Sequence, residues 1–394
     1  MDARGIYVLL LIISQIFGLY GGMLQLPRVV AILLLPAFLN SSSFYKDIRE
    51  TKAFLFFYFF IFFSLLSFLK VIDYLSVIKE ICYACVNFLI FAEIIVFAKS
   101  SRVDSFRLIT FSVTTFVFLT LPIGLVEIMF NLHFSNSIFG SDNIIGGLGI
   151  SKRYAAITFG NYNLYNHLLA IFFPFVLAFY STVKNRFIKN VTFVSIILVG
   201  YILLINGSRG AILCYLLAII IFYLFYKKNL KYRTLYNFLF LIVFTAIVLF
   251  VLNSDEFVYI ISRMSEKGVG DDSRANLIEM GVNMLIDSNL LGVGAGNFTN
   301  YVQYNFNSDI LVPHNIFVEI FSQYGIIVFG AFIYMLIVLC KNLRNLKNES
   351  HFIVLTSLLI FSLAFVINSV YLSNPYLWIY LASLFVVSKN KNVL

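Results

Sequence analysis

The sequence is short of charged residues. Asp, Glu, Lys and Arg make up 12% of its 394 residues, whereas a soluble domain has about 25%. This shortage excludes an ordinary water-soluble fold. In place of charge, 61% of the residues are hydrophobic, and Phe alone occurs 45 times. Apolar runs of about 17–25 residues recur, and each can cross a bilayer core as a helix. The sequence therefore predicts an all-α, polytopic integral membrane protein.

Signatures of several other protein classes are also absent. The four cysteines lie in or at the ends of apolar runs. Cys82 and Cys85 have the spacing of a redox motif but no soluble βαβ context, so we interpret them as small buried apolar residues. There is no P-loop, and no Asp, Glu or His cluster has metal-ligand spacing. The run Gly292–Phe298 is not preceded by a strand and lacks dinucleotide-binding glycine spacing, so it predicts a tight turn instead. We expect no metal and no cofactor.

The net charge of +9 does not indicate nucleic-acid binding. The basic residues form no single patch and recur in short loops between apolar runs, as in the cytoplasmic loops of a membrane protein. The first run, Ile6 to Tyr20, has no small-residue cleavage site after it. We therefore expect a retained span rather than a removed signal peptide.

We expect about twelve membrane spans and treat residues 1–394 as a single membrane domain. The predicted ranges are 5–21, 28–40, 53–69, 75–98, 107–130, 164–183, 190–206, 208–226, 235–252, 315–340, 351–372 and 375–388. Pro36, Pro122 and Pro174 fall inside these ranges, where neighbouring helices can accommodate a kink.

Charge decides the orientation of the spans. Alternate loops, together with both termini, hold 19 of the 28 Lys and Arg residues, and the remaining nine are spread over much longer loops. The richer side is predicted to be cytoplasmic, so both termini face the cytoplasm. The outer side then holds residues 131–163, the hairpin 206–210 and a large, partly helical extracytoplasmic loop, residues 253–314.

Arg274 stands at a predicted helix start on the outer side. Residues 271–277 open this helix, with Asp272 or Ser273 as its N-cap. Its apolar face has helical spacing: Leu277, Met280, Met284 and Leu285. A cation in the first turn opposes the helix dipole, so helix stability does not explain Arg274. A helix N-terminus with a guanidinium does suit an anion. The alternative is an exposed arginine paired with a neighbouring aspartate.

Arg209 repeats this arrangement at the start of the eighth span. Ser208 can cap the helix, and Gly207 and Gly210 allow close backbone approach. The alternative is an interfacial arginine that extends to lipid headgroups.

His314 lies at the outer start of the tenth span, between Pro313 and Asn315. Histidine exchanges protons near neutral pH, and a helix N-terminus favours the neutral imidazole, which suits a base. The alternative is an interfacial histidine without chemistry. Glu319 follows five residues later, and we expect it to pair with one of these cations because an uncompensated charge at this depth is costly.

The outer segment 131–163 and the start of the sixth span contribute further polar side chains. These are Lys152, Arg153, Asn161, Asn163, Asn166 and His167. Amides are common in sugar binding, but loop and helix capping explains them equally well. Glu93 and Glu127 lie near span ends, where interfacial placement is a sufficient explanation.

Together these segments resemble the O-antigen ligase and polymerase superfamily of bacterial envelope glycosyltransferases. The resemblance covers nearly the whole length, in the span count and in the large loop before the tenth span. The segments that carry it are Asn206–Ala211, Asp272–Arg274 with Gly292–Phe298, and Pro313–Glu319 followed by Tyr324-Gly325-Ile326. Phe159–Asn163 also resembles the family's Asn-Pro-Asn segment, with Tyr162 in the place of Pro.

The resemblance implies a substrate and roles for these residues. The family uses glycans carried on a polyprenyl diphosphate, such as undecaprenyl diphosphate, at the outer face of the bacterial inner membrane. It implies that Arg209 and Arg274 bind the diphosphate and that His314 activates the acceptor hydroxyl as the catalytic base. Further substrate-binding residues are expected from these segments, from the outer segment 131–163 and from the start of the sixth span: Arg153, Asn161, Asn163, Asn166, Asn315 and Glu319.

We therefore expect a metal-independent, inverting glycosyltransferase of surface-polysaccharide or lipopolysaccharide biosynthesis. A polymerase, which adds the chain to the next lipid-linked repeat, is favoured over a ligase, which transfers it to lipid A-core. The expected partners are the lipid-linked oligosaccharide and membrane lipids, with a chain-length regulator and a flippase as candidate proteins. A flippase is the alternative of another class. It is less favoured because transporters usually place polar groups near the midplane, often in repeats, and neither feature is visible.

Overall fold

The computed structural model describes residues 1–17, 24–41, 46, 51–69, 73–134, 153–226, 272–306, 312–346, 348–367 and 370–389. Within these ranges all regular structure is helical, as predicted. The elements are α1 (Ala3–Ile13), η1 (Ser14–Phe17), α2 (Leu26–Leu39), α4 (Phe54–Leu66), η3 (Ser67–Leu69), α5 (Tyr74–Ser100), α6 (Ser105–Phe130), η4 (Ile157–Phe159), α7 (Tyr162–Thr182), α8 (Arg186–Asn206), α9 (Arg209–Tyr226), α12 (Asp272–Asp287), α13 (Phe298–Phe306), α14 (Ile316–Asn342), η6 (Leu343–Asn345), α15 (Asn348–Ala364) and α16 (Pro375–Ser388).

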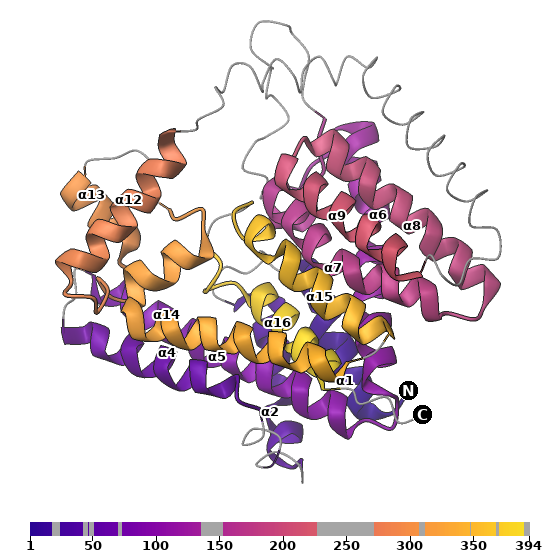
Figure 1. Ribbon diagram of the computed structural model, residues 1–394, viewed down its shortest axis with the longest axis horizontal. Helices are drawn as coiled ribbons and strands as arrows, with labels where there is room; N and C mark the ends of the chain where they lie inside the picture. The colour runs from indigo at the N-terminus through magenta and orange to yellow at the C-terminus, as the bar shows by residue number, and fades with distance from the viewer. Residues whose placement is uncertain are drawn as a thin grey trace, which may run out of the picture.

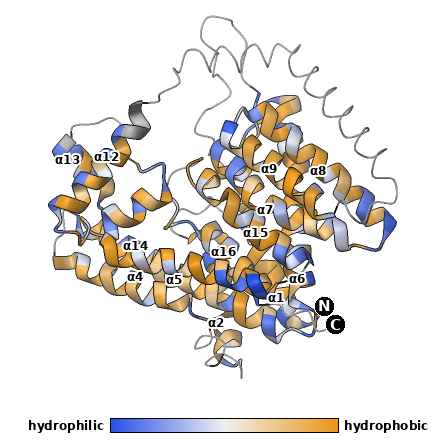
Figure 2. Cartoon of the chain, in the orientation of Figure 1, coloured by the Kyte–Doolittle hydropathy of each residue, from blue (hydrophilic) through white to orange (hydrophobic). Residues whose placement is uncertain are grey.

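Each predicted span that the structure describes overlaps a helix, but the predicted span 351–372 is too long, because α15 ends at Ala364. Only 235–252 lies outside the described residues. Among those residues, six helices are long and apolar enough to cross a membrane, namely α5, α6, α7, α8, α9 and α14, and five shorter apolar helices accompany them. Figure 2 shows that apolar residues dominate these helices and that polar residues gather at their ends. Large apolar side chains such as Leu33 (73% exposed) and Phe187 (75% exposed) cover the outer surface. These features agree with a multi-pass membrane protein, and the total of twelve spans stays a prediction.

The helices pack in two groups with α15 and α16 between them (Figure 1). On one side, α4 packs against both α5 and α14. On the other, α6, α7, α8 and α9 pack together, and α15 contacts both α7 and α9. Trp378 of α16 is fully buried and packs against Phe57, with the ring centroids 4.8 Å apart. Aromatic packing of this kind, rather than charge, fills the interior.

Hydrogen bonds at the helix ends follow the predicted alternation of sides. Asp2, which caps α1, accepts from Ser101 at the end of α5, and Lys389 after α16 donates to Thr51 before α4. These ends are predicted to share the cytoplasmic side. At the opposite ends, Ser67 accepts from the backbone N–H of Ala295, within the predicted outer loop. The direction in which either end faces stays a prediction.

Helix α14 is broken at Gly325, where φ is 79° and ψ is 179°. The backbone of the glycine run fills the break. The N–H groups of Val293 and Gly294 donate to Ser322 and Gln323, and the N–H of Ile326 donates to Leu290. A Cβ atom at Gly292, whose φ is +81°, would lie 2.5 Å from the Gln323 carbonyl oxygen. The predicted close backbone turn is therefore confirmed, and it fixes the segment that follows α12 onto α14.

The helix predicted around Arg274 is α12. Leu277 and Met284 are buried and form a cluster with Val318 of α14, which confirms the apolar face. A Cβ atom at Gly281 would lie 2.5 Å from Val318 Cγ1, so the two helices are in close contact. The described part of this helix begins at Asp272, and the identity of its N-cap stays a prediction.

Candidate functional site

The starts of three helices meet at the C-terminal end of α15. His167 in α7 makes a 2.8 Å hydrogen bond from Nδ1 to the Ala364 carbonyl oxygen. The N–H of Ile316, the first residue of α14, donates to the Phe365 carbonyl oxygen at 3.3 Å. A Cβ atom at Gly210 would lie 3.1 Å from Cγ1 of Ile367, so α9 also approaches this end. Residues 364–367 therefore join α7, α9 and α14.

Two of the predicted catalytic residues lie at this junction. Arg209 immediately precedes Gly210, is the first residue of α9, and is exposed. His314 lies two residues before Ile316 and is half-buried. The structure thus brings the starts of α9 and α14, which are far apart in the sequence, to one end of α15. Their convergence in space was not derivable from sequence spacing.

Arg274 is placed by its backbone only. It lies in the first turn of α12, as predicted, one turn before Leu277, which packs in the cluster with Val318. The position of its guanidinium lies outside the described side chains. Its role in binding a diphosphate stays a prediction.

The prediction that Glu319 pairs with one of these cations is wrong. Its two carboxylate oxygens accept hydrogen bonds from the backbone N–H groups of Tyr371 and Leu372, at 2.7 and 3.1 Å, and it makes no ion pair with a described cation. The side chain is 3% exposed. A buried carboxylate can be satisfied by backbone N–H donors as well as by a cation. Glu319 therefore holds the segment between α15 and α16 against α14.

Two predicted site asparagines act as helix caps. The Oδ1 atoms of Asn161 and Asn315 each accept a 2.8 Å hydrogen bond from the N–H two residues later, at the starts of α7 and α14. The capping alternative is therefore correct for the Asn161 oxygen, and Asn315 caps α14 in the same way. Asn163 is half-buried in the first turn of α7, and its contact with substrate stays a prediction.

Asn206, which was named only as part of a motif, joins the end of α8 to the segment before α7. Its Oδ1 accepts from the Ala155 N–H at 2.8 Å, and its Nδ2 donates to the Ala155 carbonyl oxygen at 3.0 Å and to Asn166 Oδ1 at 2.7 Å. Asn166 and Asn206 are fully buried. Arg153 lies two residues before Ala155 and is exposed.

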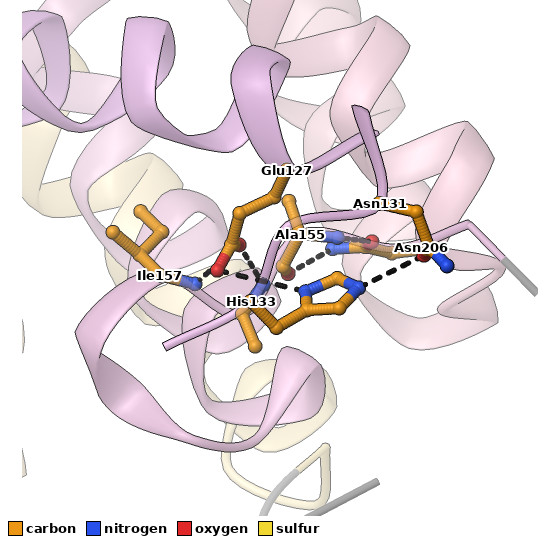
Figure 3. Close-up of polar contacts among 7 residues, drawn as sticks. Glu127, Asn131, His133, Ala155, Ile157 and Asn206 are labelled. Atoms are coloured by element: carbon orange, nitrogen blue, oxygen red, sulfur yellow. Dashed lines mark hydrogen bonds and ion pairs between the residues drawn. The ribbon is translucent and has the colours of Figure 1, made fainter. Parts of the chain in front are cut away.

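Figure 3 shows a second buried network at the same end of the bundle. Glu127 Oε2 accepts from the N–H groups of Ala156 and Ile157, both at 2.7 Å. Its Oε1 lies 3.6 Å from Nδ1 of His133. On the other side of the ring, Nε2 lies 3.1 Å from Oδ1 of Asn131. A chain of amide, imidazole and carboxylate is therefore attached to residues 156 and 157, which follow Arg153 in the sequence.

In the neutral His133 ring whose Nε2–H donates to the Asn131 oxygen, the unprotonated Nδ1 faces Glu127 Oε1 at 3.6 Å, beyond hydrogen-bond distance. Burial lowers the pKa of His133 because it disfavours the charged imidazolium. Sequence reasoning had placed Glu127 at the interface and missed His133. The residue that could have indicated a turn here is Asn131, which lies between Glu127 and His133 in the sequence. Its φ is 53°, a conformation that Asn tolerates, so it can turn the chain after a helix.

Among the described residues, no three His, Cys, Asp or Glu side chains are placed to share a metal ion. Metal independence stays a prediction.

Residues 192–333 match the O-antigen ligase family. A curated relative, teichuronic acid biosynthesis protein TuaE of Bacillus subtilis (strain 168), is 24% identical over 257 residues, which are 60% of this chain and 52% of the relative. These matches support the resemblance of the chain to the O-antigen ligase and polymerase superfamily. The chain spans about half the length of the relative it matches.

The O-antigen ligase segment contains part of the site. Arg209, Arg274, His314 and Glu319 lie inside residues 192–333, together with the glycine run and the Gly325 break. Arg153, the asparagines of α7 and the network of Glu127 and His133 lie before it. The site therefore combines the matched segment with elements that precede it.

Proposed function

We propose that the protein is a glycosyltransferase that transfers a glycan from a polyprenyl diphosphate to an acceptor hydroxyl at the outer face of the bacterial cytoplasmic membrane. The observation that carries this proposal is the meeting of the starts of α9 and α14 at residues 364–367, which brings Arg209 and His314 to one end of the bundle. The matches to the O-antigen ligase family and to the teichuronic acid relative support the same chemistry.

In the proposed reaction the acceptor oxygen attacks the anomeric carbon. The bond from that carbon to the diphosphate oxygen breaks, and the electron pair leaves with the diphosphate. His314 takes the acceptor proton, and direct displacement inverts the anomeric centre. Diphosphate is a good leaving group, so charge neutralisation by Arg209 and Arg274 and positioning of the acceptor supply the catalysis.

The helix starts suit these roles. A helix N-terminus carries a partial positive charge, which stabilises an anion near Arg209. The same charge beside His314 disfavours the imidazolium and keeps the ring able to accept a proton. Asn315 satisfies a backbone N–H at the start of α14, which orders the turn that carries the base.

The proposed acceptor is the next lipid-linked repeat unit, so that the product is a polymer. The relative's name places it in teichuronic acid biosynthesis, which supports assembly of a surface polysaccharide. Ligation to lipid A-core is the second candidate, because the matched family is described as O-antigen ligase.

The test is transfer by the purified protein from a polyprenyl-diphosphate repeat unit. A ladder of lipid-linked products with no other acceptor present supports a polymerase. Product formed only after lipid A-core is added supports a ligase. Movement of the donor across liposomes without glycosidic bond formation contradicts the proposal in favour of a flippase. EDTA should leave transfer intact, and loss restored by one divalent ion would overturn the metal-free mechanism.

A further inference from the structure

Two exposed arginines on separate segments are connected through one buried amide. Asn206 holds Ala155 at both its N–H and its carbonyl oxygen, which is a two-point attachment. Arg153 lies two residues from Ala155, and Arg209 lies three residues from Asn206. Extended chain covers at most about 7 Å in two residues and about 11 Å in three. The attachment therefore limits how far apart the two arginines can lie.

This attachment is held in place from both sides. Glu127 binds the next two N–H groups, those of Ala156 and Ile157, at 2.7 Å. Asn166 of α7 accepts from Asn206 at 2.7 Å. Buried hydrogen bonds of this kind fix backbone positions because breaking one leaves an unsatisfied group. The segment that carries Arg153 thus has a defined place beside the turn that carries Arg209.

The side chains around this attachment include hydrogen-bond donors that have no partner among the described residues. Arg153 and Arg209 are exposed cations, and neither forms an ion pair with a carboxylate among the described residues. The Nδ2 atom of Asn166 is buried and has no hydrogen-bond partner in the described part of the chain. Two cations that stand near each other repel, and an anion between them removes this repulsion. Guanidinium groups bind phosphate oxygens in a bidentate manner.

We propose that Arg153 and Arg209 form one anion site, with Asn206 as the positioning residue, and that this site binds the diphosphate of the lipid-linked donor. This inference rests on the proposed function and adds Arg153 to its diphosphate site. A phospholipid headgroup offers the same phosphate chemistry, so the experiment separates the two sources.

The first measurement is the affinity of a short-chain polyprenyl diphosphate for the purified protein in phosphatidylcholine nanodiscs. Arg153→Ala and Arg209→Ala should each weaken binding by about 10-fold or more, because each removes a charge-assisted contact. Arg186→Ala is the matched control, since this exposed arginine begins α8 at its opposite end, and it should bind as the wild type does. The double variant should lose less than the product of the single losses, because both contacts serve one ligand.

The positioning role has its own readout. In an Asn206→Ala background, Arg153→Ala should change the affinity by less than threefold, because the attachment that places Arg153 is already lost. An effect of Arg153→Ala as large as in the wild type would overturn the role of Asn206.

Each failure has a different meaning. Wild-type affinity in Arg153→Ala, with a loss in Arg209→Ala, overturns the shared site and leaves the proposed function intact. No binding of the diphosphate to the wild type contradicts the proposed function itself. Competition by inorganic pyrophosphate, but not by added phosphatidylglycerol, supports the donor as the ligand. Equal competition by phosphatidylglycerol overturns that assignment and indicates a headgroup site.

Discussion

Buried polar side chains in this protein hold backbone groups. Glu127 and Glu319 each accept two hydrogen bonds from backbone N–H groups of segments between helices. Asn206 accepts one from the Ala155 N–H and donates one to the Ala155 carbonyl oxygen. Non-helical backbone inside a membrane protein needs such partners, because lipid supplies none. These residues fix the segments around the candidate site. Arg153, Arg209 and His314 are exposed or half-buried, and we propose that they contact the substrate.

At the residue scale, the arginines should not be replaceable by lysine. Arg209→Lys and Arg274→Lys should each reduce transfer by about 10-fold or more while the protein still accumulates, because lysine is a point charge that cannot bind phosphate in a bidentate manner. The measurement is product formation by matched amounts of purified variants, with Arg186→Lys as control. Full product from both lysine variants would refute the diphosphate role.

The positions of single residues were predictable from the sequence where they follow residues typical of a helix start. Arg209, Arg274 and His314 follow capping or turn residues, and all three lie at helix starts as expected. The partners of buried groups were not predictable, because they come from distant segments. Glu319 bonds to Tyr371 and Leu372, and nothing in the sequence near Glu319 indicates that pair.

At the element scale, the break in α14 depends on two glycines that meet in space. Gly292→Ala should lower the free energy of unfolding by about 2 kcal/mol or more, because alanine disfavours a φ of +81° and its Cβ would clash with the Gln323 carbonyl. Gly330→Ala, in α14, is the control, since no atom lies within 4 Å of the added Cβ. It should change stability by less than about 1 kcal/mol. Thermal unfolding in detergent measures both. Equal effects of the two substitutions would contradict the interlocked backbone.

Asp2 makes the start of α1 sensitive to acid. A hydrogen bond from Ser101, together with backbone N–H donors, lowers the pKa of Asp2 from 3.8 to about 2. Between these values the unfolded chain binds more protons than the folded one, so stability rises with pH. The contribution is complete above pH 3.8 and is lost as the pH falls toward 2. The unfolding temperature of the wild type should therefore fall more between pH 4 and pH 2.5 than that of Asp2→Asn. Parallel curves would show that Asp2 does not cause the acid sensitivity.

Hydropathy was sufficient to locate the helices but not their interruptions. The run 315–340 is apolar enough overall to predict one continuous span, yet α14 breaks at Gly325, just after the polar residues Ser322 and Gln323. The break exists because the backbone of residues 290–294 bonds to the exposed groups. Such a pairing between distant segments leaves no periodic signal in either one.

At the scale of the whole molecule, the orientation rests on the bias of basic residues, 19 against nine. After replacement of the native cysteines, Ser254→Cys and Asn307→Cys should react with an impermeant thiol reagent in intact cells. Lys184→Cys, at an exposed position on the predicted cytoplasmic side, should react only after permeabilisation. The reverse pattern would invert the topology and remove Arg209 and His314 from the outer face.

The most direct test of the proposed chemistry is single-turnover transfer by His314 variants, measured with donor binding on the same samples. His314→Ala should lower the transfer rate by about 10²–10⁴-fold, which is the range of a general base, while donor affinity stays within twofold because the arginines hold the diphosphate. His314→Gln should not restore the rate, since an amide bonds but takes no proton. Near wild-type transfer by His314→Gln, or equal loss of binding and transfer in His314→Ala, would contradict the role of His314 as the base.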